Sequence, residues 1–276
     1  MSKLYVVGTP IGNLSDFSPR AVETLKSVDF IAAEDTRVTM KLLTHFGIQK
    51  PMISYHEHNI RSKGEEIIAR IMDGESCAIC TDAGMPCISD PGEDLVRLCA
   101  MHGVETVVVP SPTAAMSALA VSGLSTSRFS FEGFLSVNKK QRSDHLEEIK
   151  SYHRTLIFYE APHKLKYTLD DLLEALGDRR IALCRELTKV HEEIIRGTIS
   201  QMIAKYEAES PRGEYVLIVE GAPYEEEAAK AEITREEAAA MAQELVDGGR
   251  KASDACKEIA AKTKFSKSEI YRELLS

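Results

Sequence analysis

No stretch of the 276-residue sequence is apolar for long enough to cross a bilayer, so no membrane-spanning helix is expected. The six cysteines lack the regular spacing of a secreted disulfide framework, which favours a reducing compartment. The first eight residues predict a β-strand rather than a cleavable signal peptide. Together these absences predict a cytoplasmic protein.

The sequence has more acidic than basic side chains, 43 against 34, and its net charge is −9. A protein coated in positive charge is therefore excluded, whereas local basic surfaces are not. One such surface is predicted at residues 250–272, which carry seven lysines or arginines against three acids. Another is predicted at residues 138–142, which are expected to form a loop. Either group could bind nucleic acid, although most such runs are merely solvated faces.

Two chemical signatures are also missing. The loop at residues 8–12 has neither the Gly-Lys-Ser/Thr ending of a phosphate-binding loop nor the third glycine of a dinucleotide fingerprint, which disfavours nucleotide hydrolysis. His56 and His58 would lie on one face of a predicted strand at residues 53–57, a spacing that can hold zinc. No third ligand is identifiable, so a metal is not expected.

The most informative feature that is present is the glycine- and proline-rich segment 81–92 after a predicted strand. Gly84 and Gly92 allow backbone geometries that are closed to other residues, while Pro86 and Pro91 fix φ and remove N–H groups. A stiff loop of little bulk is suited to close contact with a ligand. A tight strand-to-helix connection without a ligand would have the same composition.

Two further predicted strands end in comparable loops, at residues 8–13 and 110–115. Open α/β sheets bind ligands at the carboxyl ends of their strands, so three such loops favour a ligand site. The alternation of strands and helices predicts an α/β domain over residues 1–122 and a second one over residues 123–222. Residues 223–276 predict a helical extension that resembles a helix-turn-helix.

Charged residues follow two predicted strands of the second domain. Glu160 and His163 would stand at the tip of one strand, where a general base is useful, although capping and a surface histidine explain them equally well. Glu186 belongs to a charged run at residues 185–193, which could instead be a salt-bridge network.

Taken together, residues 8–14, 34–37, 55–59, 82–92, 159–163 and 185–193 resemble one family. It is the bacterial small-subunit ribosomal RNA 2′-O-ribose methyltransferases, members of the tetrapyrrole-methylase superfamily that act on a decoding-centre cytidine. The resemblance covers nearly the whole chain. It implies two α/β domains of tetrapyrrole-methylase type with S-adenosylmethionine in the cleft between them, a small helical C-terminal extension, and no metal or membrane. It also implies 16S rRNA or the small ribosomal subunit as substrate and a homodimer.

The same resemblance assigns residues to roles. The cofactor pocket would be lined by Pro10, Asp82, Ala83, Gly84, Met85, Pro86, Ile88, Ser89, Thr113, Ala114, Tyr159, Glu160, Ala161 and Leu187. The group that accepts the ribose proton would be Glu160, His163 or Glu186. RNA phosphates would be bound by the basic C-terminal helices and by Arg37, Lys139, Lys140, Arg142, Arg185 and Lys189.

The chain departs from the family pattern at two positions. Relatives commonly carry threonine where this chain has Met85, and arginine where it has Lys164. The first change removes a hydroxyl contact, and the second replaces a planar donor with a point charge. Two alternative functions remain open: methylation of a tetrapyrrole or another small metabolite, and a non-catalytic regulator that senses S-adenosylmethionine and binds nucleic acid.

Overall fold

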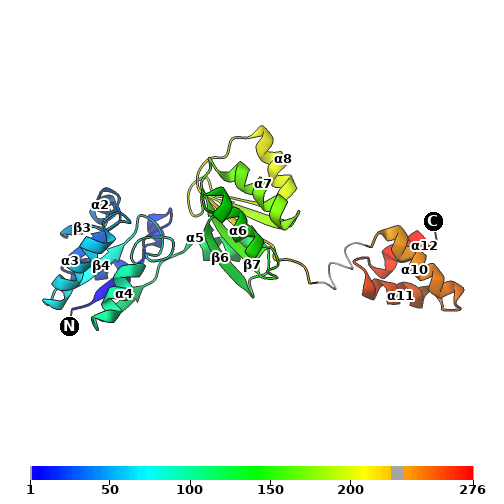
Figure 1. Ribbon diagram of the computed structural model, residues 1–276, viewed down its shortest axis with the longest axis horizontal. Coiled ribbons are helices and arrows are strands. Elements are labelled where there is room, and N and C mark those ends of the chain that lie inside the picture. The colour runs from blue at the N-terminus through cyan, green and yellow to red at the C-terminus, as the bar shows by residue number, and fades with distance from the viewer. Residues whose placement is uncertain (1, 225–232, 276) are drawn as a thin grey trace. The chain divides into compact units, whose positions relative to one another are not determined.

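The computed structural model describes residues 2–224 and 233–275. The chain divides into two compact units. One comprises residues 1–150 and 154–220, and the other residues 151–153 and 221–276. The first unit contains two sheets with helices packed on them, and the second is helical (Figure 1). No helix within these described ranges has the length and apolar character that spanning a bilayer requires.

The first sheet is parallel throughout, with the strand order β3-β2-β4-β1-β5. Its strands are β1 (Leu4–Val7), β2 (Phe30–Ala33), β3 (Met52–Ser54), β4 (Cys77–Cys80) and β5 (Thr106–Val109). The connections contain α1 (Pro19–Ser27), α2 (Thr36–His45), α3 (Ile60–Met72), α4 (Glu93–Met101) and the short 3-10 helix η1 (Leu14–Asp16). Because the strands run in one direction, their carboxyl ends lie at one edge.

Helices cover both faces of this sheet. Side chains of β1 alternate between two hydrophobic clusters: Leu4 and Val6 pack with α3 and α4, whereas Val7 packs with α1 and α2. The central strands β2 and β4 are consequently buried at every position. Ser18 caps the start of α1, since its hydroxyl accepts a hydrogen bond from the Ala21 amide at 3.1 Å.

The second sheet is mixed, with the order β6-β7-β10-β8-β9. Its strands are β6 (Phe129–Phe134), β7 (Thr155–Glu160), β8 (Arg180–Arg185), β9 (Glu193–Thr198) and β10 (Tyr215–Val219). The β6–β7 pair is parallel and the other three pairs are antiparallel. Helices α5 (Ala114–Ser122), α6 (Lys139–Ile149), α7 (Leu165–Leu176) and α8 (Ile199–Ala208) accompany it.

Two features of this region differ from the expectations. The small apolar face of α5 packs on the second sheet, so the expected boundary between residues 122 and 123 falls after a helix that belongs with the second domain. Residues 138–142, expected as a loop, instead begin α6. The Asn138 side chain caps that helix by accepting hydrogen bonds from the Lys140 and Gln141 amides at 3.0 and 3.2 Å.

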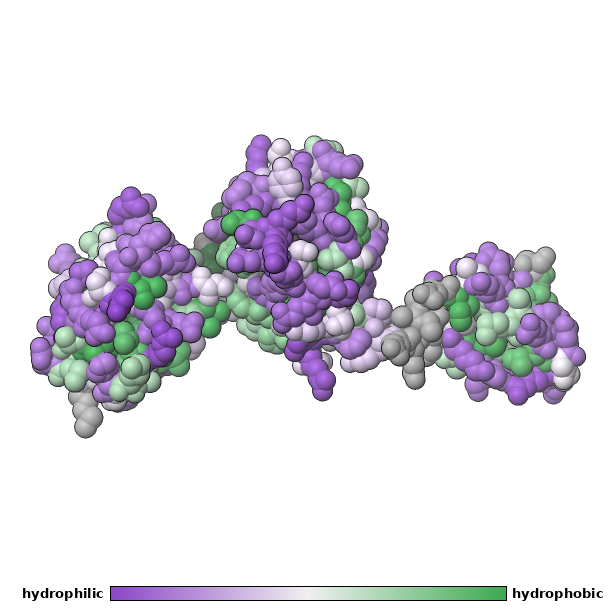
Figure 2. Space-filling view, in the orientation of Figure 1, coloured by the Kyte–Doolittle hydropathy of each residue, from purple (hydrophilic) through white to green (hydrophobic). Residues whose placement is uncertain are grey.

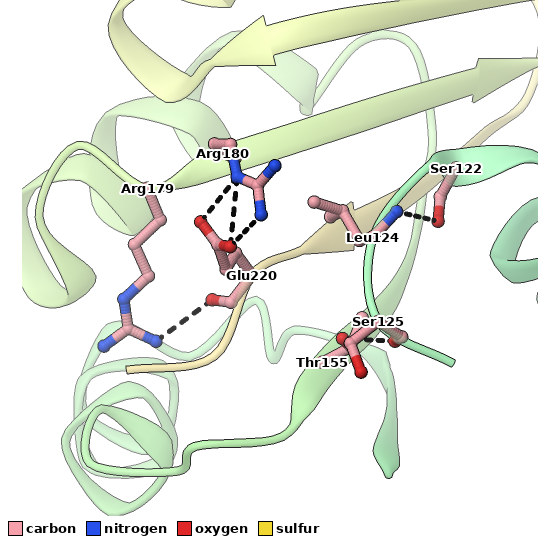
Figure 3. Close-up of polar contacts among 7 residues, drawn as sticks. All are labelled: Ser122, Leu124, Ser125, Thr155, Arg179, Arg180 and Glu220. Carbon is pink, nitrogen blue, oxygen red and sulfur yellow. Dashed lines mark hydrogen bonds and ion pairs between the residues drawn. The ribbon is translucent and has the colours of Figure 1, made fainter. Parts of the chain in front are cut away.

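Polar contacts hold the chain where it enters and leaves the second sheet (Figure 3). The Thr155 hydroxyl donates to the Ser125 carbonyl at 2.7 Å, just after α5. At the other end, the Arg180 guanidinium forms an ion pair with the Glu220 carboxylate, and Arg179 donates to the Glu220 carbonyl at 3.3 Å. Both ends of the domain are therefore fixed to its strands.

The second unit contains α10 (Arg235–Asp247), α11 (Ala252–Lys262) and α12 (Lys267–Leu274), each packed on the other two. Its small core is formed by Ala238, Ala242, Cys256, Ile259 and Ile270. Capping boxes at Thr234 and Ser266 start α10 and α12. On the face shown in Figure 2, hydrophilic residues predominate in both units, with hydrophobic ones scattered among them.

Candidate active site

The loops that follow β1, β4 and β5 meet at the carboxyl edge of the parallel sheet. The Thr9 amide donates to the Gly84 carbonyl at 2.8 Å, and the Gly84 amide donates to the Thr9 carbonyl at 3.1 Å. The Thr9 hydroxyl donates to the Thr81 carbonyl at 3.2 Å, and the Ser111 hydroxyl donates to the Thr9 carbonyl at 2.9 Å. Thr9 therefore fastens the three loops at one point.

Glycine at position 8 permits this close approach. A Cβ there would lie 2.4 Å from the Cβ of Ser111 and 2.6 Å from the sulfur of Met85, which is closer than real side chains come. Gly84 has a φ of +84°, which glycine adopts without strain. Backbone atoms, rather than large side chains, form the surface where these loops meet.

Two other residues of the same segment hold positive φ without being glycine. Cys87 has a φ of 72° and Ser89 a φ of 60°. Such conformations cost on the order of 1–3 kcal/mol each and concentrate at functional sites. The segment is thus held in a specific, strained shape.

Tyr159, near the end of β7, connects the second sheet to the start of α5. Its hydroxyl accepts a hydrogen bond from the Ala115 amide at 3.2 Å, and its ring contacts Phe131 and Phe134 edge-on. Burial raises the pKa of the Tyr159 phenol, which therefore stays neutral.

The loop after β8 meets the loop after β1. Leu187 is buried in a hydrophobic cluster that Ile11, Ala114 and Tyr159 pack against. A Cβ on Gly12 would lie 3.0 Å from the Leu187 carbonyl oxygen, so the two loops approach within the space that glycine leaves. Segments from both sheets are in direct contact here.

The predicted cofactor residues belong to these loops and strand ends. They are Pro10, Asp82, Ala83, Gly84, Met85, Pro86, Ile88, Ser89, Thr113, Ala114, Tyr159, Ala161 and Leu187. Their binding role stays a prediction. Glu160 belongs to the same set but is directed elsewhere, because its carboxylate accepts hydrogen bonds from the Thr168 hydroxyl of α7 and, at 2.8 Å, from the Ala161 amide.

The three predicted proton acceptors have different surroundings. Glu160 is 4% exposed and engaged as described. The Glu186 carboxylate accepts hydrogen bonds from the Lys189 ammonium at 2.9 Å and the Glu214 amide at 3.0 Å. Partial burial favours the neutral acid, but these hydrogen bonds outweigh it and lower the pKa of Glu186, which makes it a weak base. His163 is exposed in the turn after β7.

The predicted RNA-binding cations fall into two groups. Arg142 and Arg185 form ion pairs with Asp171 and Glu193, and Lys189 pairs with Glu186 as well as with Glu214. These three cations are engaged in ion pairs within the protein.

The other group consists of Lys139, Lys140 and Arg37. Both lysines are exposed in the first turn of α6. The Arg37 side chain is 87% exposed although it contacts Asp35 at 2.6 Å. Lys139 and Lys140 are therefore available to a phosphate, whereas Arg37 is exposed but already paired with Asp35.

The expected placement of His56 and His58 on a strand is wrong, because β3 ends at Ser54. Both histidines lie in the following loop with ring centroids 5.8 Å apart. Within the described residues, no group of three or more His, Cys, Asp or Glu side chains is arranged to hold a metal ion.

Sequence reasoning missed a polar group between the ends of β2 and β4. The Thr81 hydroxyl donates to the Glu34 carboxylate at 2.6 Å, and the Asp82 amide donates to the same oxygen at 3.3 Å. Burial and the charge of Glu34 raise the pKa of Asp82.

This fold and loop arrangement matches a known class. The family model described as Tetrapyrrole (Corrin/Porphyrin) Methylases matches residues 3–203. Among solved structures, diphthine synthase is similar with a TM-score of 0.63 and 14% identity, covering 80% of this chain and 90% of that one. A uroporphyrin-III-C-methyltransferase from Thermus thermophilus has a TM-score of 0.57 at 18% identity over 79% of this chain and 94% of that one. The class defined by fold and loops is the tetrapyrrole methylases.

Curated relatives identify one family within this class. Proteins named ribosomal RNA small subunit methyltransferase I are 45% identical in Synechocystis sp., over 99% of this chain and 97% of the relative, and 45% identical in Bacillus subtilis, over 98% and 93%. The protein of that name in Escherichia coli O157:H7 is 44% identical over 88% and 90%. Within the tetrapyrrole methylases, the chain belongs to the ribosomal RNA small subunit methyltransferase I family.

Proposed function

We propose that this protein methylates the ribose 2′-hydroxyl of a decoding-centre cytidine in 16S rRNA, with S-adenosylmethionine as methyl donor. The observation that carries the proposal is the point at which Thr9 fastens three strand-end loops, in a chain of the ribosomal RNA small subunit methyltransferase I family. A ribosomal substrate implies action in the cytoplasm, and the family resemblance supports a homodimer.

The residues at this junction fit the cofactor. Gly8 and Gly12 let neighbouring loops pack closely together, because a Cβ at either position would overlap with an adjacent loop, and the Gly84 backbone adopts a positive φ without strain. Small molecules in such sites are oriented by a few polar groups against an apolar surface. Here Asp82 and the Thr113 hydroxyl would supply polar contacts, and Leu187 and Ile88 apolar ones. When bound, S-adenosylmethionine supplies an electrophilic methyl group on a sulfonium.

The contribution of the protein would be orientation and exclusion of water. Holding two reactants in line supplies on the order of 7–11 kcal/mol. Rigid loops achieve this better than mobile ones, which agrees with the strained φ values of Cys87 and Ser89. The neutral phenol of Tyr159 fixes the start of α5 relative to β7.

RNA binding would use basic side chains at the surface of both units. Lys139 and Lys140 are exposed at the beginning of α6. Residues 250–272 of the helical unit carry seven further basic side chains against three acids. Contacts of this kind release counterions, so RNA affinity would fall steeply with salt.

The proposal is tested by incubating the purified protein with methyl-labelled S-adenosylmethionine and immature small ribosomal subunits, free 16S rRNA or a tetrapyrrole precursor. We expect label in the rRNA, on ribose. Label in the tetrapyrrole alone would favour a small-metabolite methyltransferase. Cofactor binding without turnover on any acceptor would favour a non-catalytic sensor.

A further inference from the structure

A series of hydrogen bonds connects α6 and α7 to the end of β7. The Arg142 guanidinium, on α6, donates to the Thr168 hydroxyl of α7 at 2.8 Å. That hydroxyl donates to one oxygen of the Glu160 carboxylate, and the other oxygen accepts a hydrogen bond from the Ala161 amide at 2.8 Å. This Arg142–Ala161 network thus ends on the backbone of a residue that is predicted to contact the cofactor.

The network is withdrawn from solvent. Thr168 has no exposed surface, and Glu160 is 4% exposed. The Arg142 side chain is 13% exposed. Because a buried polar group that loses its partner is costly, these hydrogen bonds hold the groups that they join in defined positions.

The direction of each hydrogen bond in the network follows from the chemistry of its members. An arginine has donors only, so the Thr168 hydroxyl accepts from Arg142 and its single proton is left for Glu160. A threonine within a helix can instead donate to the carbonyl four residues before it, which would leave Glu160 without this donor. Glu160 consequently accepts at both oxygens and holds Ala161.

Arg142 is itself fixed by a second contact. Its guanidinium forms an ion pair with Asp171, which lies three residues after Thr168 and therefore on the same face of α7. A planar guanidinium donates to two residues at once, whereas a lysine ammonium is a point charge on a flexible stem. Arg142 therefore bridges α6 to α7 and orients the Thr168 hydroxyl toward Glu160.

The turn after β7 is fixed on both sides of Ala161. Glu160 holds the Ala161 amide, and the Lys164 amide donates to the Ala161 carbonyl at 3.1 Å. Tyr159, which precedes Glu160, accepts a hydrogen bond from the start of α5 and contacts Phe134 of β6. The network thus supports the strand end from behind, where Tyr159 and Ala161 are predicted to line the cofactor site.

We propose that Arg142, Thr168 and Glu160 are positioning residues for methyl transfer, which hold the Ala161 backbone in place for S-adenosylmethionine. The inference rests on the proposed function. It gives Glu160 a role other than proton acceptor, and Arg142 a role other than phosphate binding. A displacement of about 1 Å in a positioning group can slow catalysis by about 100-fold, so loss of a member should reduce turnover beyond its effect on stability.

The first test compares Thr168→Val with Thr168→Ser. Valine has nearly the shape of threonine but no hydroxyl, whereas serine keeps the hydroxyl and loses only a methyl group. Single-turnover methylation of saturating small ribosomal subunits should slow by about 10- to 100-fold in Thr168→Val, and Thr168→Ser should stay within about threefold of native. A Thr168→Val rate within about threefold of native would overturn the inference.

Leu176→Ala controls for lost stability. Leu176 is buried at the other end of α7 and has no part in the network, so its truncation should lower the urea midpoint. The single-turnover rate of Leu176→Ala should nevertheless stay within about threefold of native. If Leu176→Ala is slowed as much as Thr168→Val, the effect of Thr168 is one of stability alone and the inference fails.

A second readout involves neither cofactor nor turnover. In cofactor-free protein labelled with ¹⁵N-alanine, the Ala161 amide resonance should move in Thr168→Val and its hydrogen exchange should become faster. Both properties should stay close to native in Thr168→Ser. An Ala161 amide that exchanges in Thr168→Val as slowly as in the native protein would contradict the network.

Arg142→Met separates positioning from RNA binding and keeps the inference testable if Thr168→Val does not fold. Methionine retains an apolar stem but donates no hydrogen bond. Arg142→Met should slow single turnover as Thr168→Val does and leave the slope of log RNA affinity against log salt concentration unchanged. A slope reduced by about 1, together with a native rate on saturating subunits, would assign Arg142 to a phosphate and overturn the inference.

The inference and the proposed function fail in distinguishable ways. If the native protein transfers no methyl group to rRNA, the proposed function fails, while the Ala161 amide still reports on the network. If the native protein methylates rRNA and the Thr168→Val and Arg142→Met variants keep its rate, only the positioning role fails.

Discussion

Substitution of Gly8 by alanine would separate the loops that form the candidate cofactor site. The new Cβ would lie 2.4 Å from the Cβ of Ser111 and 3.0 Å from its backbone nitrogen, whereas ordinary van der Waals contact starts at 3.4 Å. The β5 loop must therefore move outward by about 1 Å, which also strains the hydrogen bond from Ser111 to Thr9. Overpacking of this kind costs about 1–3 kcal/mol of stability.

Binding should suffer more than stability alone explains. A displacement of about 1 Å in a positioning residue can reduce catalysis by about 100-fold, and each 1.4 kcal/mol corresponds to about a tenfold change in affinity. We expect Gly8→Ala to weaken S-adenosylmethionine binding at least tenfold in calorimetry. Its free energy of unfolding, measured in urea, should fall by about 1–3 kcal/mol.

Gly47→Ala is the matched control. Gly47 has a φ of +63° with nothing within 4 Å of a Cβ, so alanine there strains the backbone without touching a neighbour. It should lower stability by about 1 kcal/mol and leave cofactor affinity unchanged. If Gly8→Ala binds the cofactor as tightly as the native protein, or if Gly47→Ala loses affinity equally, the loops at Thr9 are not the binding site.

Three further predictions concern RNA binding and stability. Replacing both Lys139 and Lys140 by alanine should reduce the slope of log RNA affinity against log salt concentration by about 1 to 2. The control, Lys63→Ala/Lys205→Ala, removes lysines that pair with glutamates three or four positions further along the chain and should leave the slope unchanged. Filter binding at several salt concentrations measures both slopes. Thr168→Val leaves a buried oxygen of Glu160 without its donor and should cost about 1–3 kcal/mol of unfolding free energy. Thr39→Val removes a buried hydroxyl that has no hydrogen-bond partner among the described residues, so it should be neutral or stabilising, and equal losses in urea melts would contradict this reading. The pKa of Glu186 is lower in the folded protein than its ordinary value. The ionised Glu186 therefore contributes to stability fully above its ordinary pKa, and this contribution is lost as the pH falls through the pKa in the folded protein. If the melting temperature of Glu186→Gln falls with acid as steeply as that of the native protein, the pairing with Lys189 is contradicted.

Much of the fold was predictable because local signals agree with tertiary packing. The strand before the 81–92 segment lies where the sequence predicted it, and Ser18, a residue type typical of helix starts, caps α1. Helix α6 was missed because its mean hydropathy is low and only Leu146 and Ile149 are buried, so no apolar stripe indicated a helix. The packing of α5 on the second sheet was not predicted, because chain order does not reveal which sheet a short, small-residue helix covers.

The location of the candidate site was predictable from the sequence, but the hydrogen bonding of its carboxylates was not. Glycines and prolines in strand-end loops show where a backbone can approach a ligand, and the structure brings those loops together at Thr9. Whether a carboxylate already accepts hydrogen bonds from other residues depends on the tertiary structure. Sequence alone could not show that Thr168 and Ala161 donate hydrogen bonds to Glu160, or that Lys189 and Glu214 donate them to Glu186.

The most direct test of the central claim is nucleoside mass spectrometry of 16S rRNA, taken from small ribosomal subunits that were incubated with the purified protein and S-adenosylmethionine. The account predicts a gain of 2′-O-methylcytidine at a decoding-centre position, and no gain when the cofactor is omitted. Methylation confined to a base, or RNA that gains no methyl group although the protein binds the cofactor, would contradict it.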